Sequence, residues 1–156
     1  MDDRTLQKDI TSPSHKIKWG TAILGPKPLI NIHVGSPIAE PIQINLTQPV
    51  ILGRNEENDP NMQINLTAFE AAQRGVSRRH ASLEKVDKMA TLTDLNSKNG
   101  TFLNGHLLFG NQRRILRDGD EIRLAQLVMY IYYVKPTSED KDARIKSIIR
   151  HAHDLE

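Results

Sequence analysis

The sequence predicts an all-β fold, an antiparallel β-sandwich, over the middle of the chain. Within residues 29–134, short segments rich in Ile, Val, Leu and Thr alternate with clusters of Gly, Pro, Asn and Asp. Segments of this length and spacing are typical of many-stranded antiparallel sheets. Period-two alternation in Ile42, Ile44 and Leu46 indicates a strand with one buried face, whereas the apolar run 127–134 indicates a strand buried on both faces.

Eight segments between the turn clusters are strand candidates, enough for one sandwich. At 156 residues the chain has room for one domain with tails, but not for two independent cores. We therefore expect a flexible N-terminal segment over residues 1–27, the domain over residues 28–135 and a C-terminal helix over residues 136–156. Trp19 and residues 22–24 are candidate anchors of the first segment. In chain order, the candidate strands are residues 29–34, 41–46, 49–53, 80–86, 89–95, 101–105, 121–125 and 127–134.

Two helices should accompany the strands. A short one is expected near Thr67–Arg74, because Thr67 and Glu70 have the spacing of a capping box and Gly75 suits the position after the helix end. The second should begin after Pro136, with acidic residues in its first turn. Its cap should be Thr137 or Ser138, and its apolar stripe, which needs a surface to cover, should be Ile145, Ile148, Ile149 and Ala152.

The composition excludes a strong overall electrostatic field. Lys and Arg number 21 against 19 for Asp and Glu, so the net charge is only +2. The absence of cysteine suits a reducing cytosol. The first residues, MDDRTLQKD, are unlike a secretory signal, and no apolar run is long enough to cross a bilayer. His151 and His153 at a helix end are typical of solvent-exposed residues. We therefore expect a cytoplasmic protein with no cofactor and no metal site.

Three loops carry unusual chemistry for a small β protein. They contain GR at residues 53–54, GVSRRH at residues 75–80 and NSKNGT at residues 96–101. Loops at the strand ends of a sandwich cluster at one apex, and these would bring together guanidinium, hydroxyl, ammonium and amide donors. The donors are Arg54, Ser77, Arg78, Lys98 and Asn99, with no carboxylate among them. The pattern therefore indicates a socket for an anion.

These loops belong to a longer series of motifs that resembles the forkhead-associated (FHA) domain family. The resemblance covers roughly residues 30–134 and leaves both tails unexplained. Five motifs in the family's order make it specific. They are Gly53-Arg54, the SRRH of residues 77–80, the DLNSKNGT of residues 94–101, the LNG of residues 103–105 and the LRDGDEIRL of residues 116–124.

The resemblance implies a sandwich of about eleven strands that binds phosphothreonine peptides through its apical loops. By analogy, Arg54 and Ser77 hold the phosphate, Arg78 reinforces them, Lys98 lies at the rim and Asn99 bonds the peptide backbone. Structural support of the site is expected from Gly53, His80, Gly100, Thr101, Asn104 and Gly105, where His80 should link the Ser77 loop to the next one.

Two positions depart from the family pattern. The segment from Arg54 to Ser77 is longer than usual and holds the predicted helix at Thr67, so it should alter the rim and the preference for peptide side chains. Ala125 stands where the family often has glycine. Neither departure removes a phosphate donor.

Other functions fit less well. Ser77, His80 and Asp94 could form a nucleophilic triad, but GVSRR lacks the second glycine of a nucleophile elbow, so we assign no catalytic residue. Two alternatives stay open: a phosphate-independent FHA-like scaffold and a nucleic-acid-binding module. The second is disfavoured by the aromatic share of only 4%. Its phosphate contacts would be Arg74, Arg78, Arg79, Lys98, Lys141, Arg144, Lys146 and Arg150.

The expected partner is a phosphothreonine-containing protein, either a Ser/Thr kinase or its substrate. No nucleic acid and no membrane are expected. Thr5, Thr11, Ser12 and Ser14 lie in the N-terminal segment, where phosphorylation could let the tail occupy its own apex or that of a neighbouring molecule. The whole pattern predicts a noncatalytic adaptor in kinase signalling.

Overall fold

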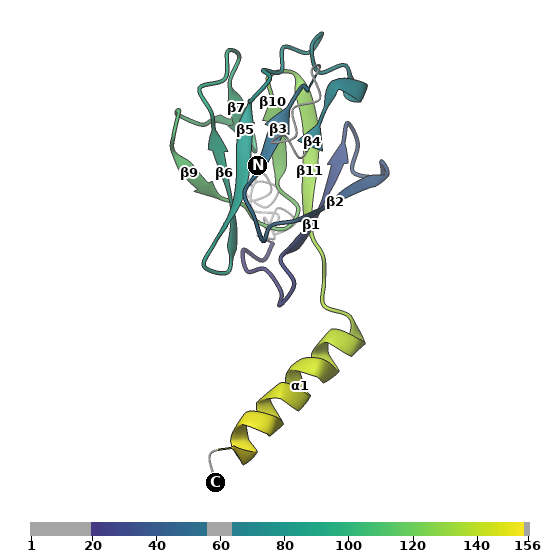
Figure 1. Cartoon of the computed structure of the whole chain (residues 1–156). Coiled ribbons are helices and arrows are strands. Elements are labelled where there is room, and N and C mark those ends of the chain that lie inside the picture. The colour runs from purple at the N-terminus through teal and green to yellow at the C-terminus, as the bar shows by residue number, and fades with distance from the viewer. Residues whose placement is uncertain (1–19, 56–63, 155–156) are drawn as a thin grey trace, which may run out of the picture.

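The computed structural model describes residues 20–55 and 64–154, which form two stacked β-sheets and a C-terminal helix (Figure 1). All eight predicted strands are present, and three strands of two or three residues add to them. The strands are β1 (Leu29–Val34), β2 (Pro41–Asn45), β3 (Val50–Gly53), β4 (Ile64–Asn65), β5 (Ala81–Val86), β6 (Met89–Asp94), β7 (Thr101–Leu103), β8 (His106–Leu107), β9 (Arg113–Ile115), β10 (Glu121–Leu124) and β11 (Leu127–Tyr133).

The strands divide between a sheet of order β2-β1-β11-β10-β7-β8 and a sheet of order β4-β3-β5-β6-β9. This sandwich of eleven strands confirms the predicted fold class. One pairing differs from the prediction, because β4 runs parallel to β3, with Leu52 opposite Ile64. The second sheet is therefore mixed, because its other pairings are antiparallel.

The core lies between the sheets and is built by alternation along each strand. Ile30 and Ile32 of β1 are fully buried, as are Met129 and Ile131 of the neighbouring β11. Burying each such side chain contributes about 1.5–3 kcal/mol. The intervening residues of β11 are only half-buried, so the prediction that this strand is buried on both faces is wrong. Its outer face is partly exposed, and Tyr132 on that face makes an edge-on ring contact with His33 of β1.

The segment before β5 contains less helix than the sequence predicts. A 3-10 helix spans Thr67–Phe69 only, without a side-chain cap, so the predicted capping box is wrong. The hydroxyl of Thr67 instead donates to Asn65 Oδ1 at 2.5 Å, and Glu70 adopts the left-handed conformation with φ 59°. Gly75 does end a helical turn as predicted, with φ 79° and a hydrogen bond from the next backbone N–H to the carbonyl of Ala71.

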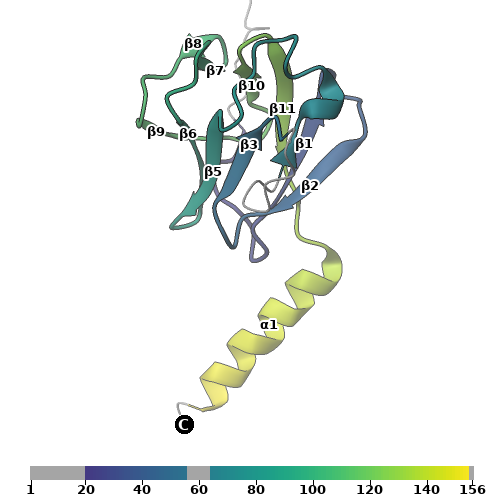
Figure 2. The ribbon, with the colours of Figure 1, turned by 45° about the horizontal axis from the view of Figure 1, so that its top comes forward.

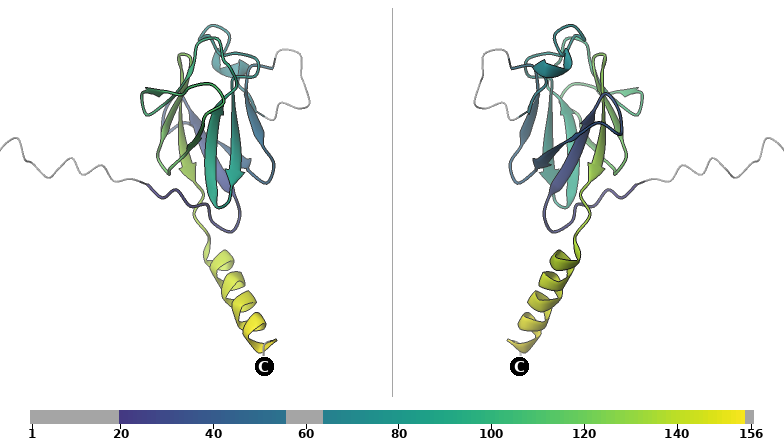
Figure 3. Two further views of the ribbon diagram at one scale, coloured as in Figure 1. Left: turned by 90° about the vertical axis from the view of Figure 1, so that its left-hand side faces the viewer. Right: turned by 90° about the vertical axis from the view of Figure 1, so that its right-hand side faces the viewer.

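The C-terminal helix α1 (Ser138–His153) begins as predicted, and Thr137 is its cap. Thr137 and Asp140 form a capping box, and Asp140 also pairs with Lys27 at 2.8 Å. Both side views show α1 extending below the sandwich (Figure 3). The helix buries no residue, and its stripe of Ile145, Ile148 and Ile149 is exposed, so the expected covering surface is not provided by the described residues.

The N-terminal residues that the structure describes run along the base of the sandwich. Leu24 is buried in the core, and its backbone N–H donates to the carbonyl of Lys88 at 2.7 Å. It is therefore one anchor, as residues 22–24 suggested, whereas Trp19 lies outside the described residues. The domain boundaries proposed from the sequence stay a prediction.

Candidate functional site

The loops that follow β3 and precede β5 are in direct contact at the end of the sandwich opposite α1 (Figure 2). The backbone N–H of Arg54 donates to the carbonyl of Ser77 at 3.3 Å, and Arg54 Nε donates to the carbonyl of Val76 at 2.8 Å. A Cβ added at Gly53 would lie 1.9 Å from the carbonyl oxygen of Arg78. Glycine is therefore required before Arg54, because the two backbones approach too closely for any side chain.

The loop after β6 joins this pair through Ser77. The backbone N–H of Lys98 donates to Ser77 Oγ at 3.1 Å, which fixes the hydroxyl beside the cationic loop. Ser77 Oγ can still donate its own proton, and no acceptor for it is found among the described residues. Arg54, Ser77 and Lys98 thus come together from three separate loops. We call these three residues, with Arg78 and Asn99, the apical cluster.

Asn99 closes the cluster against the turn before β5. Its Nδ2 donates to the carbonyl of Gly75 at 2.9 Å. This bond fixes the orientation of the side-chain amide and leaves its oxygen available to accept from a ligand. Gly75 has φ 79°, and a Cβ there would lie 2.7 Å from Asn99 Nδ2, so only glycine fits.

Two cations of the cluster, Arg78 and Lys98, lie at solvent-exposed positions. Neither side chain has an ion-pair partner among residues 20–55 and 64–154. Asp94, at the start of the loop after β6, is buried and its carboxylate accepts hydrogen bonds from hydroxyl groups. The cluster is therefore a set of hydrogen-bond donors with net positive charge, a combination that suits an anion.

His80 ties two of the loops together from beneath. It is fully buried; the backbone N–H of Ser77 donates to its Nδ1 at 3.0 Å, and its Nε2 lies 2.9 Å from the carbonyl of Gly100. Since Nδ1 accepts, the ring proton resides on Nε2 and is donated to Gly100. Burial lowers the pKa of His80, against the opposing effects of the Gly100 carbonyl and the Asp94 charge. His80 thus contacts both the Ser77 loop and the loop after β6.

The same bonds rule out the geometry of a Ser-His-Asp triad at these positions. His80 Nδ1 meets the backbone N–H of Ser77 instead of its hydroxyl, and the Asp94 carboxylate meets neither ring nitrogen. A nucleophilic serine needs its hydroxyl bonded to the histidine, and the histidine oriented by the carboxylate. The Ser77 hydroxyl is therefore not paired with His80, whose ring nitrogens contact backbone groups instead.

Asp94 organises the loop after β6, a role that the sequence did not reveal. Its Oδ1 accepts from Ser97 Oγ at 2.5 Å and from Thr101 Oγ1 at 2.7 Å, while Oδ2 accepts from the Ser97 backbone N–H at 3.2 Å. Ser97 Oγ in turn accepts from the Gly100 backbone N–H at 3.0 Å. An aspartate with serine three residues later is a known local hydrogen-bonding pattern and could have indicated both residues.

Asn104 and Gly105 lie farther from the apical cluster. They form the two-residue turn between β7 and β8, with φ 48° and 82° respectively. Asn104 donates to Asp120 Oδ1 at 2.9 Å and accepts from the Glu121 backbone N–H at 2.9 Å. The pair therefore joins β7 to the loop before β10, and neither of these Asn104 side-chain bonds involves the apical cluster.

Ala125 has φ 53°, which explains why its position favours glycine. It begins the turn between β10 and β11, and its backbone N–H donates to the carbonyl of Gly100 at 2.9 Å. The turn is thereby fixed to the loop that carries Asn99. A side chain is accommodated there at the cost of local backbone strain.

Other kinds of site find little support in the structure. No group of three metal-binding side chains occurs in the described part of the chain. Within those residues, no helix is both long and apolar enough to cross a membrane.

The two-sheet fold and its cationic apex define a β-sandwich binding module with its candidate site on loops. The sequence profile of the FHA domain matches residues 50–125, which contain the entire apical cluster. Residues 50–125 of this chain are therefore similar to the FHA domain family. A search of curated proteins found no match.

Solved structures with the same fold include several FHA domains. One, from a structural and functional analysis of phosphothreonine-dependent FHA domain interactions, is 28% identical with a TM-score of 0.54, covering 70% of this chain and 99% of that one. The FhaA FHA domain, solved in complex with the intracellular domain of Rv3910, is 29% identical with a TM-score of 0.51, covering 65% and 98%. Mycobacterium tuberculosis EmbR, solved with a low-affinity phosphopeptide, shares the fold at 20% identity and a TM-score of 0.55, covering 70% and 25%.

Proposed function

We propose that this chain is a noncatalytic module that binds phosphothreonine-containing proteins through its apical cluster. The observation that carries the proposal is the meeting of Arg54, Ser77 and Lys98 from three loops, joined by the bonds from Arg54 to the Val76 carbonyl and from Lys98 to Ser77 Oγ. Similarity to an FHA domain studied for phosphothreonine-dependent interactions supports the ligand class.

Each residue of the cluster has a distinct proposed role. The Arg54 guanidinium and the Ser77 hydroxyl bond the phosphate oxygens, and Arg78 adds a second guanidinium from the exposed side. Lys98 supplies charge at the rim, while the free oxygen of the Asn99 amide accepts from a backbone N–H of the peptide. Charge-assisted hydrogen bonds of this kind are worth about 1.5–3 kcal/mol each.

The partner is proposed to be a Ser/Thr kinase or a substrate of one, in the cytoplasm. Phosphothreonine is preferred over phosphoserine, since one methyl group in a fitted niche can supply about 1–3 kcal/mol of discrimination. A phosphorylated N-terminal segment of the same chain is a further proposed ligand, which would occupy the apex and lead to self-association or to self-inhibition.

The test is an oriented library of phosphothreonine peptides, followed by calorimetry of the best sequence in phosphothreonine, phosphoserine and unphosphorylated forms. We expect binding by the first, weaker binding by the second and none by the third. A salt titration of the same peptide should give a shallow dependence, as expected for one phosphate. Equal affinity for the unphosphorylated peptide would favour a phosphate-independent scaffold, and a steep salt dependence with DNA or RNA would favour nucleic-acid binding.

A further inference from the structure

A second concave surface lies at the base of the sandwich, at the opposite end from the apical cluster (Figure 1). Its volume is about 610 Å³, and we call it the basal cavity. It is bounded by residues 21–26, the turn between β5 and β6, the link from β11 to α1, and the first half of α1. No residue of the apical cluster lines it.

The segments around the basal cavity are connected by direct contacts. The backbone N–H of Leu24 donates to the carbonyl of Lys88 at 2.7 Å, which fixes the N-terminal segment to the turn between β5 and β6. The ion pair between Lys27 and Asp140, at 2.8 Å, connects the same segment to the first turn of α1. The cavity is thus enclosed by parts of the chain that contact one another.

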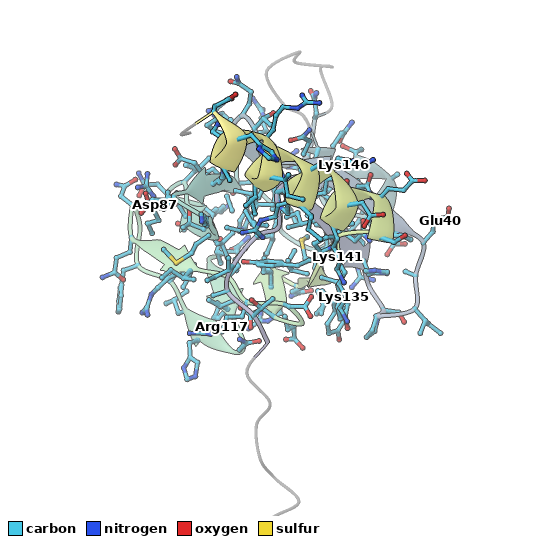
Figure 4. The ribbon with its side chains drawn as sticks, turned by 90° about the horizontal axis from the view of Figure 1, so that it is seen from below. Glu40, Asp87, Arg117, Lys135, Lys141 and Lys146 are labelled. Carbon is cyan, nitrogen blue, oxygen red and sulfur yellow. The ribbon has the colours of Figure 1, made fainter. Side chains whose placement is uncertain are left out.

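Four of the side chains that line the basal cavity are basic, and none is acidic. Lys85 and Lys88 come from the end of β5 and the turn after it, Lys135 from the link before α1, and Arg144 from α1. All four are exposed, and none forms an ion pair among the residues that the structure describes. Asp87 lies on the opposite side of the base from Lys135 when the base is seen from below (Figure 4). The lining therefore carries a net positive charge, which attracts an anionic ligand.

The rest of the lining is mainly apolar. Ile23 is 60% exposed, and Pro26 and Pro136 line the same cavity. Covering such side chains with an aliphatic group removes apolar surface from water. Tyr133, the one aromatic residue in this lining, is buried, and its hydroxyl donates to the Leu116 carbonyl at 2.6 Å, so its ring is not presented for stacking on a base. The lining suits a ligand that combines anionic groups with an aliphatic group.

The arrangement favours a peptide over a single phosphate or a lipid surface. Three of the four cations are lysines, which are point charges without the planar fork that matches phosphate oxygens, and they come from separate segments. A bilayer surface is flat, whereas this surface is concave and α1 extends below the sandwich beside it (Figure 3). An extended peptide points successive side chains in opposite directions, so its carboxylates can reach the basic side chains while an aliphatic residue enters the cavity.

We propose that the basal cavity binds an acidic segment of a partner protein, in which carboxylates flank an aliphatic side chain. This binding requires no phosphorylation and does not involve the apical cluster, so it goes beyond the proposed function. The affinity for the isolated segment is modest, because all four cations are exposed and their ion pairs are screened by solvent. Since the two surfaces lie at opposite ends of the sandwich, one molecule can hold a phosphothreonine segment and an acidic segment together.

The test is fluorescence anisotropy on the full chain at about 0.1 M salt, with a short fluorescein-labelled peptide in which Glu and Asp surround a central Leu. Lys88→Glu and Lys135→Glu, on two different walls, should each weaken binding by about threefold or more, because an attraction becomes a repulsion. Lys146→Glu is the matched control: Lys146 is exposed on α1 and does not line the cavity, so binding should change by less than about twofold. The same peptide with Gln and Asn in place of the acids should bind much more weakly.

The proposal would be overturned if the acidic peptide did not bind the parent protein, if the neutral peptide bound equally well, or if Lys146→Glu lost as much affinity as the two cavity variants. Displacement of the peptide by an equal concentration of inorganic phosphate would assign the cavity to a phosphate instead. Binding to phosphatidylserine vesicles that both reversals abolish, without peptide binding, would assign it to a lipid surface; either result would overturn the proposal. Binding of a phosphothreonine peptide is measured separately on the same variants, and its failure would contradict the proposed function alone.

Discussion

The two ends of the molecule both carry clustered cations but differ in what holds them. At the apex, Arg54 is bonded to the Val76 carbonyl and the Lys98 backbone to Ser77 Oγ, above the buried His80. At the base, α1 buries no residue, and its capping box and the pair between Lys27 and Asp140 are its principal polar contacts there. Seen from below, α1 crosses under the sandwich with Lys141 and Lys146 on its surface (Figure 4).

The difference shows why charge alone does not define a binding site. Long, exposed side chains such as Lys146 and Arg150 must lose conformational freedom when they bind a ligand. The Arg54 guanidinium is already restrained by its bond to Val76, so less freedom is lost on binding. Removing a positive charge should therefore weaken ligand binding strongly at the preorganised apex and only slightly on the solvated helix.

The largest effect should follow from removing the buried support of the apex. His80→Ala creates a cavity, leaves the Ser77 N–H without its acceptor and removes one of the two donors to the Gly100 carbonyl, at a cost of about 3 kcal/mol or more in the free energy of unfolding. Urea denaturation measures this directly. His106→Ala, at an exposed histidine of β8, is the control and should stay within about 0.5 kcal/mol of the parent. Similar values for the two variants would contradict the role given to His80.

The next effect concerns binding. Arg54→Ala should weaken the affinity for a phosphothreonine peptide by about tenfold to a hundredfold, because it removes charge-assisted bonds to the phosphate. The matched charge deletion is Lys146→Ala on α1, which should change the affinity by less than about twofold. Calorimetry on both folded variants compares the two ends of the molecule. Equal losses would mean that overall charge, and not the arrangement at the apex, determines binding.

The stability of the apex should depend on pH through His80. Its folded-state pKa is lowered from 6.5, chiefly by burial, so the unfolded chain takes up a proton that the folded chain does not. The stability contribution is thus complete above about pH 6.5 and declines as the pH falls from there toward the folded pKa, by at most about 1.4 kcal/mol per pH unit. Unfolding free energies at about pH 7.5 and about pH 5.5 give the change. The His106→Ala variant should retain this dependence, and a level profile in the parent would contradict it.

The sequence predicted the parts of the fold that repeat a physical pattern. Strands β1, β5 and β11 carry alternating apolar residues, and Thr137 and Asp140 mark the start of α1. The motifs that resemble FHA domains also identified the loops after β3, before β5 and after β6, which the structure brings into contact. Strands β4, β8 and β9 were missed, because two or three residues are too few to show periodicity.

The sequence-based predictions were wrong where a polar side chain has more than one possible hydrogen-bond partner. Thr67 was expected to cap a helix, but its hydroxyl donates to the side-chain oxygen of Asn65. This hydrogen bond depends on where β4, which contains Asn65, lies in the folded chain. The bonds from Asp94 to Ser97 and Thr101 likewise form only when the loop after β6 closes on the end of its strand. The β10–β11 turn also contacts the segment before β5, through the hydrogen bond from the Gln126 N–H to the Arg74 carbonyl at 3.0 Å, and no local sequence pattern predicts that contact.

A smaller effect should come from the strained turn at Ala125. Its φ of 53° is unfavourable for an L residue, so Ala125→Gly should raise the free energy of unfolding by about 0.5–1 kcal/mol. Gln126→Gly is the control: the φ of Gln126 is not positive, and glycine there should lower stability by a similar amount. Chemical denaturation of the two variants should therefore give changes of opposite sign. A destabilised Ala125→Gly protein would mean that the buried methyl group contributes more than the strain costs.

The smallest effect should follow from removing α1 altogether. A chain that ends at Pro136 loses no buried residue, so its free energy of unfolding should change by less than about 0.5 kcal/mol and its affinity for a phosphothreonine peptide should be unchanged. Ending the chain at Ile131 is the contrasting deletion. It also removes Tyr133, whose hydroxyl donates to the Leu116 carbonyl at 2.6 Å and whose backbone N–H donates to Asp118, so the sandwich should not fold.

In the intact chain, an isolated helix of 16 residues should lose its circular dichroism signal gradually on heating, below the cooperative transition of the sheets. If truncation at Pro136 instead lowered stability by more than about 1 kcal/mol, the Ile145, Ile148 and Ile149 stripe would be packing on the sandwich in solution. The apex and α1 would then no longer differ in this respect, because both would be held by packing against the sandwich.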